Sequence, residues 1–114
     1  MDSKDIAQLA AKAMDDKKAR QISILELKER SLLTDYFVLA NGASRTQTQA
    51  IADNVEEELE KVGVKLTRRE GYPEGRWVLL DFGFIIVHIF QEEERLFYNL
   101  ERLWGDAPRL RYEG

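Results

Sequence analysis

Apolar side chains recur at the spacing of an amphipathic helix in three segments of the chain. The first begins at Ser3, a residue type that caps helices, and the second begins at Ser44, where a glutamine three residues later completes a capping box. The second segment ends at Gly63, and the third runs from near Glu92 to Gly105. The apolar stripe of the third segment consists of Leu96, Leu100 and Leu103, with Phe97 and Trp104 beside it.

The remaining apolar segments are of strand length and are rich in Val, Ile and aromatic residues. They cover residues 21–27, 36–40, 64–68, 76–81 and 84–90. The resulting order is α-β-β-α-β-β-β-α, which predicts an α/β (α+β) fold, a single-domain mixed β-sheet flanked by helices. No comparable pattern follows Ala107, so we expect one domain over residues 1–107 and a flexible C-terminal tail over residues 108–114.

Composition narrows the class of protein. A length of 114 residues fits one domain, and 17 basic against 21 acidic residues give a net charge of −4. Because each neutralised phosphate requires a cation, this balance disfavours extensive contact with RNA or DNA. The absence of cysteine excludes disulfides, thiol catalysis and cysteine-based zinc sites. No apolar run approaches the roughly 20 residues of a membrane span, so we expect a cytoplasmic protein with no membrane contact.

The residue types needed for catalysis are sparse. His88 is the single histidine, which excludes a histidine-based metal cluster and favours a strand histidine hydrogen-bonded at the sheet surface. The turn around Gly42 and Ser44 joins a strand to a helix but lacks the lysine and glycine spacing of a phosphate-binding loop. Asp35 and Asp53 are not spaced as a magnesium-binding pair. We therefore expect no catalytic residue, no metal and no cofactor.

The segment 76–81, Arg-Trp-Val-Leu-Leu-Asp, has a pattern that bears on partner binding. Alternation along a strand places Trp77, Leu79 and Asp81 on one face and the residues between them on the other. If the intervening residues face the helices, the tryptophan face lies away from the core, and such apolar patches usually mark partner surfaces. Spacing alone leaves the opposite register, with Trp77 in the core, equally open.

Several longer blocks carry a family resemblance. From about Ile6 to Ala107, the chain resembles the ribosomal silencing factor family, also called the Iojap family. The blocks are Asp-Tyr-Phe-Val-Leu-Ala-Asn-Gly at 35–42, Gln-Ala-Ile-Ala-Asp at 49–53, Glu-Gly-Arg-Trp-Val-Leu-Leu-Asp-Phe-Gly at 74–83, Val-His-Ile-Phe at 87–90 and the whole of 92–107.

The resemblance implies a nucleotidyltransferase-like topology without transferase chemistry. It also implies binding to the large ribosomal subunit through its fourteenth protein, at the face where the small subunit joins. Occupying that face would block joining and repress translation under nutrient limitation. The family's contact surface corresponds to Trp77 and Leu79, which favours the register with both side chains outside the core. A homodimer is a further implied partner.

Three acidic residues lie in or near the same motif. Glu70, Glu74 and Asp81 around an apolar centre would orient the chain on a basic ribosomal protein, with little direct RNA contact. Phe84 and Gln91 stand where family members commonly have an acidic residue and a histidine, and both are expected near the contact surface.

Two alternatives to ribosome binding remain open. One is nucleotide binding or transferase activity in the crevice near the strand-to-helix turn described above, and the other is self-association through the tryptophan face.

Overall fold

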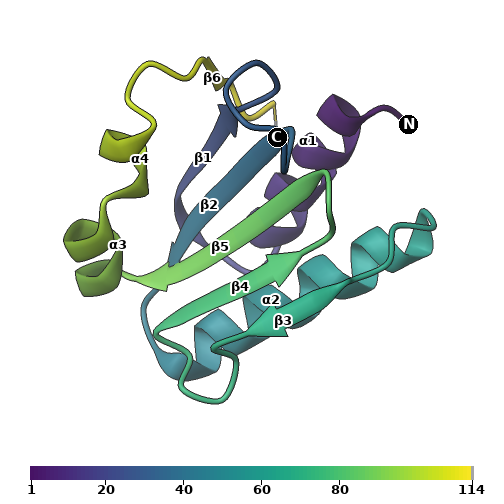
Figure 1. Ribbon diagram of the computed structural model, residues 1–114. Helices are drawn as coiled ribbons and strands as arrows, with labels where there is room; N and C mark the ends of the chain where they lie inside the picture. Colours follow the sequence, from purple (N-terminus) through teal and green to yellow (C-terminus); the bar gives the residue numbers. More distant parts are fainter. Residues whose placement is uncertain (114) are drawn as a thin grey trace.

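The computed structural model describes residues 1–113 and shows a six-stranded sheet with the strand order β3-β4-β5-β2-β1-β6 (Figure 1). Strands β2 and β5 run parallel at its centre, and the other neighbours pair antiparallel. The elements are α1 (Ser3–Asp15), β1 (Arg20–Glu26), β2 (Tyr36–Gly42), α2 (Arg45–Lys61), β3 (Arg68–Glu70), β4 (Trp77–Asp81), β5 (Ile85–Gln91), α3 (Glu92–Tyr98), α4 (Leu100–Leu103) and β6 (Arg109–Leu110). The expected α/β class with a mixed sheet is confirmed.

Helices α1 and α2 lie side by side on one face of the sheet, behind it in Figure 1. Val38, Val87, Val78 and Leu80 point from three neighbouring strands into the core beneath these helices, and all four are fully buried. Helices α3 and α4 lie at one side of the sheet, beside the end of β5 at the left of Figure 1, and α3 contacts β5 and β2. Much of the face opposite α1 and α2 therefore has no helix over it.

Helix α2 has the signals that the sequence predicts. The Ser44 side chain accepts a hydrogen bond from the Gln47 amide at 3.1 Å, and Gly63 follows the helix with φ +82°, a conformation that favours glycine. Helix α1 differs in one detail, because the capping side chain is Asp2, which accepts from the Asp5 amide at 2.9 Å, and not Ser3. Both helices otherwise confirm the predicted elements.

The expected third helix is broken in two. Asn99 adopts a left-handed conformation with φ 45°, which ends α3 and begins α4. The periodic leucines predicted to be its buried stripe are mostly outside the core, since Leu96 and Leu103 are each 72% exposed. The prediction of one continuous amphipathic helix is therefore wrong.

Arg95 attaches the α3–α4 segment to the sheet. Its guanidinium is buried and donates hydrogen bonds to the Gln21 carbonyl and to the Asn41 side chain, at 3.0 Å for the latter. It also forms a bidentate ion pair with Glu101 at 3.0 and 3.1 Å. A buried cation with all of these partners helps to hold the segment in place through polar contacts, in addition to the apolar packing of Leu100 and Trp104.

The chain after Ala107 contains a short strand. Arg109 and Leu110 form β6, which pairs with β1 at the edge of the sheet, and the Tyr112 hydroxyl donates to Asp15 on α1 at 2.9 Å. The expected flexible tail over residues 108–114 thus includes a short strand that the sequence did not predict, and Gly114 lies outside the described residues. A second difference is that β3 covers Arg68–Glu70, where the sequence predicted a strand over 64–68.

Candidate functional site

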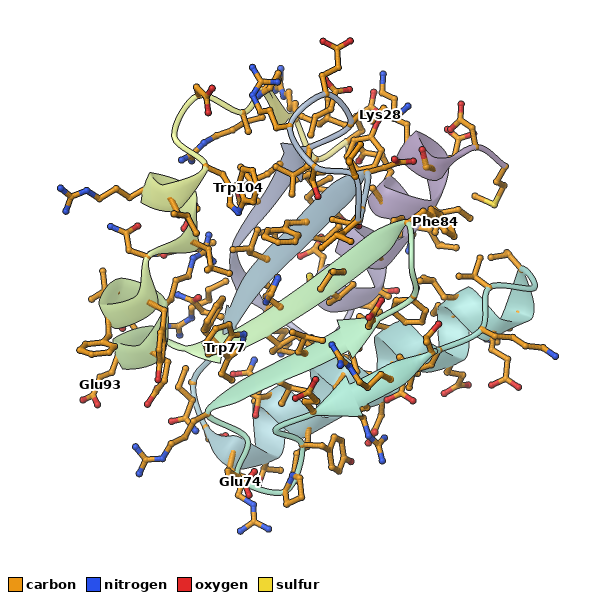
Figure 2. The ribbon with its side chains drawn as sticks, in the orientation of Figure 1. Lys28, Glu74, Trp77, Phe84, Glu93 and Trp104 are labelled. Atoms are coloured by element: carbon orange, nitrogen blue, oxygen red, sulfur yellow. The ribbon has the colours of Figure 1, made fainter. Side chains whose placement is uncertain are left out.

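An apolar area occupies the sheet face opposite α1 and α2. We call it the open face and define it by Phe37, Trp77, Leu79 and Ile86, each of which is half-buried. These residues come from the three adjacent strands β2, β4 and β5, and Phe37 and Ile86 are directly paired. Figure 2 shows Trp77 on the side of the sheet turned toward the viewer, with α1 and α2 behind it. The strand register that places Trp77 and Leu79 outside the helix-covered core is confirmed.

Trp77 is held by its neighbours at the edge of this face. Its ring stacks on Phe90 with the centroids 5.1 Å apart and contacts the Tyr98 ring at 4.5 Å. Its indole Nε1–H donates to Nδ1 of His88 at 3.1 Å. The tryptophan thus has a fixed orientation, with part of its surface still accessible to a partner.

His88 lies beneath the open face and not at the sheet surface, where the sequence placed it. It is 3% exposed, and burial lowers the pKa of its imidazole to about 3, so the ring is neutral under ordinary conditions. The expected hydrogen bond is present, with Trp77 as donor. Nε2 of His88 has no hydrogen-bond partner among residues 1–113.

The buried imidazole gives stability a pH dependence. Because the unfolded chain takes up a proton on His88 near pH 6.5 and the folded chain does so only near pH 3, the unfolded state binds more protons in between. Stability is therefore lost as the pH falls from 6.5 toward 3. His88→Asn should remove this component, so that the free energy of unfolding falls less steeply on acidification than in the wild type. Urea denaturation at several pH values between 7.5 and 4 measures the free energy of unfolding of both proteins. If the two free energies fell in parallel with pH, the prediction would be contradicted.

Two of the expected acidic residues lie at one border of the open face. Arg68 bridges them, with its Nε 2.9 Å from a Glu70 oxygen and its Nη2 3.8 Å from an Asp81 oxygen. The Asp81 carboxylate also accepts the Gly83 amide at 2.8 Å in the β4–β5 turn. The border therefore carries two carboxylates that share one guanidinium, and its negative charge is smaller than the sequence suggested.

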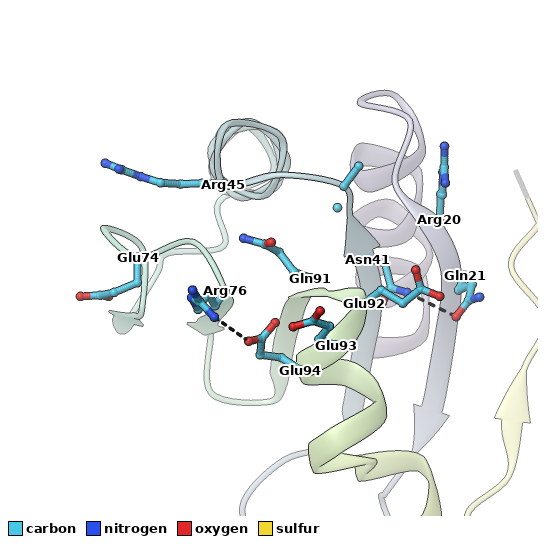
Figure 3. A pocket seen from close by; sticks show the side chains of 12 residues that line it. Arg20, Gln21, Asn41, Arg45, Glu74, Arg76, Gln91, Glu92, Glu93 and Glu94 are labelled. Carbon is cyan, nitrogen blue, oxygen red and sulfur yellow. Dashed lines mark hydrogen bonds and ion pairs between the residues drawn. The ribbon is translucent and has the colours of Figure 1, made fainter.

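The third expected acidic residue, Glu74, lies elsewhere. It is exposed on the turn before β4 and lines a cleft of about 640 Å³ at the carboxyl ends of β2 and β5. The cleft contains charges of both signs, and on one side of it Nη1 of Arg76 lies 3.5 Å from a Glu94 carboxylate oxygen. Figure 3 marks this ion pair with a dashed line. The structure therefore brings Trp77, Leu79, Asp81 and Glu70 together and leaves Glu74 apart from them.

The cleft is the crevice that the nucleotide-binding alternative requires. Gly42 lines it, as does Arg45, the first residue of α2. Gln91 also lines it and donates to the Gly75 carbonyl at 3.0 Å, which places this residue away from the open face. Phe84, the other departure from the family pattern, is 36% exposed in the β4–β5 turn. Within residues 1–113, no group of three or more His, Asp or Glu side chains could hold a metal ion.

These features define a class of protein, a single-domain mixed α+β fold with an uncovered apolar sheet face. Comparison with known proteins specifies the family. The family described as "Ribosomal silencing factor during starvation" matches residues 1–114. The chain belongs to this ribosomal silencing factor family, whose members include the proteins called Iojap.

Individual relatives and solved structures agree with this assignment. Ribosomal silencing factor RsfS of Halalkalibacterium halodurans is 46% identical over 114 residues, covering 100% of this chain and 97% of the relative. RsfS of Bacillus subtilis is 45% identical over 108 residues, covering 95% and 92%. A crystal structure of a Chromobacterium violaceum protein superposes with a TM-score of 0.90 at 32% identity, covering 100% of this chain and 94% of that one. The relatives are named as silencing factors and not as enzymes.

No helix in residues 1–113 has both the length and the apolar character that crossing a membrane requires.

Proposed function

We propose that this protein binds the large ribosomal subunit through its fourteenth protein and, by occupying the subunit-joining face, prevents the small subunit from docking. The observation that carries this proposal is the open face of Phe37, Trp77, Leu79 and Ile86, which α1 and α2 do not cover. The α3–α4 segment meets this face at one edge, through Tyr98 against Trp77 and Trp104 against Phe37. Partly accessible aromatic and aliphatic side chains that are already fixed in place are typical of the centre of a protein interface. Blocking by bulk requires binding alone, so no active site is needed.

Charge supports a protein contact over an RNA contact. Ribosomal RNA would repel a protein with a net charge of −4. Glu70 and Asp81 border the open face and would attract a basic protein surface. Because Arg68 partly neutralises them, we expect these carboxylates to guide association more than to hold the complex. Glu74 lines the cleft and does not share the Arg68 ion pairs of this border, so we propose that it contributes at the periphery of the interface. A cytoplasmic location is part of the proposal.

Sucrose-gradient fractionation with purified ribosomal subunits tests the function directly. We expect the protein to sediment with large subunits and to lower the amount of joined ribosomes when small subunits are added. Sedimentation with neither subunit, or with the large subunit without any loss of joining, would contradict the proposal.

The same open face suits a second copy of the chain, so we propose that a homodimer and the ribosomal complex compete. Sedimentation velocity over a range of concentrations should show self-association that Leu79→Ala weakens. We expect addition of the isolated ribosomal partner to dissociate the dimer. A dimer that persists in the ribosomal complex would show that the two surfaces are separate.

Nucleotide binding in the cleft is the second candidate function, favoured by the position of the cleft at the ends of the parallel strands. Against it stand two observations: no cluster of three or more His, Asp or Glu side chains within residues 1–113 could hold a metal ion, and Asp35 and Asp53 are not spaced as a magnesium-binding pair. We expect magnesium with ATP or GTP to leave the Tm unchanged. A nucleotide present at 100 times its Kd would instead stabilise the fold by about 2.7 kcal/mol, and loss of that gain in Arg45→Ala would place it in the cleft.

A further inference from the structure

The hydrogen bond between Trp77 and His88 has a fixed direction. An indole nitrogen can only donate, so Nδ1 of His88 must be unprotonated and must accept. A neutral imidazole then carries its single proton on Nε2. The hydrogen bond therefore fixes both the tautomer of the histidine and the side of the indole that faces the sheet.

Burying the His88 imidazole at this position costs folding free energy. It lies on β5 between Leu39 of β2 and Leu79 of β4, and the Phe37 ring meets it edge-on with the centroids 4.6 Å apart. Its Nε2–H is buried without an acceptor among residues 1–113, and such an orphaned donor costs free energy that a leucine would not. The one hydrogen bond that the imidazole makes within the described chain is the one to Trp77.

We propose that His88 is a positioning residue, whose neutral imidazole holds the Trp77 indole in the orientation in which it meets the partner. Three groups then fix the indole, because Phe90 and Tyr98 contact its ring and His88 binds its N–H. A side chain that is already ordered in the free protein loses less conformational entropy on binding. The N–H is also used within the chain, so the partner meets Trp77 through apolar contacts alone.

This proposal rests on the proposed function, and two variants separate a positioning role from a merely structural one. His88→Leu removes the acceptor at similar volume, whereas His88→Asn keeps an acceptor near the position of Nδ1. We expect His88→Leu to weaken binding to the large subunit by about 3- to 10-fold and His88→Asn to restore most of it. Circular dichroism and urea denaturation confirm that both variants fold.

The indole proton provides a readout that does not depend on the ribosome. In the wild type, we expect the Trp77 Nε1–H proton to exchange slowly with water, as followed by its NMR resonance. The Trp104→Phe variant, which retains one indole, assigns this resonance to Trp77. His88→Leu should speed this exchange at least several-fold, and His88→Asn should not. An unchanged exchange rate in His88→Leu would overturn the proposal.

A double-mutant cycle completes the test. Trp77→Phe removes the indole N–H, so the effect of His88→Leu on affinity should fall below about 2-fold in that background. An equal effect in both backgrounds would show that His88 acts independently of the indole and would overturn the positioning role. Trp77→Ala in the same binding assay tells the two failures apart, because if it leaves affinity unchanged, the proposed interface itself is wrong.

Discussion

Trp77→Ala is expected to weaken binding to the large ribosomal subunit by about 2–4 kcal/mol, the range for an aromatic residue at the centre of an interface. The accessible part of the indole would be lost from the open face, together with the contacts that it makes with Phe90 and Tyr98. Co-sedimentation with large subunits at a series of protein concentrations gives the affinity. Wild-type affinity in this variant would rule out the open face as the contact surface.

The variant needs a folding control because Trp77 is half-buried. We expect the variant to fold with unchanged circular dichroism, since the core beneath α1 and α2 does not contain this side chain. Its free energy of unfolding should fall, because Trp77 packs on Phe90 in the second apolar cluster and makes the hydrogen bond to His88. Val62→Ala is the matched surface control, because Val62 is 43% exposed at the end of α2, which covers the opposite face. We expect it to bind as the wild type does.

Glu101→Gln is expected to lower the free energy of unfolding by about 2–3 kcal/mol, because it leaves the buried Arg95 guanidinium without its carboxylate. The loss should be concentrated in α3 and α4, where amide hydrogen exchange should speed up before the sheet opens. Glu57→Gln is the control. Glu57 is 3.9 Å from Lys61 in an exposed pair, and removing such a pair costs about 0.5 kcal/mol or less. Equal costs in the two variants would contradict the anchoring role.

The ion pair between Arg95 and Glu101 also predicts that the free energy of unfolding depends on pH in the acid range. Hydrogen bonds from Arg95 hold the pKa of Glu101 below its ordinary value of 4.5. A carboxylate with a lowered pKa contributes stability that is present above its unfolded pKa and is lost as the pH falls through its folded pKa. The wild type should therefore lose its advantage over Glu101→Gln below about pH 4.5. A constant difference down to pH 2.5 would contradict this.

The sequence predicted elements best where several local signals coincide. Helix α2 has a cap at Ser44, a stop at Gly63 and a buried stripe, and each of these signals is sufficient to place a boundary or a face. The α3–α4 segment also has a leucine stripe, but its conformation depends on contacts of Arg95 with β1 and β2, more than fifty residues away along the chain. No periodicity within the segment could reveal those contacts or the left-handed Asn99.

In the candidate site too, local sequence rules predict some residues correctly, whereas others depend on contacts that the sequence does not reveal. Alternation along a strand correctly groups Trp77, Leu79 and Asp81, because the rule holds wherever β4 is regular. Glu74 precedes the strand in a turn, where alternation does not apply, and so it lies at the cleft. The link between Trp77 and His88 needs the β4–β5 register, and one sequence without that register gives no signal for it.

The parallel pairing of β2 with β5 has a consequence for how fast the chain folds. Val38 lies beside Val87, so the centre of the sheet forms only when residues 49 positions apart meet. The β1–β2 and β4–β5 hairpins are local and can form first, but joining them requires closure of the long segment that contains α2. We expect the rate-limiting step to be this closure, so that Val38→Ala slows folding while truncations at the β6 edge mainly speed unfolding.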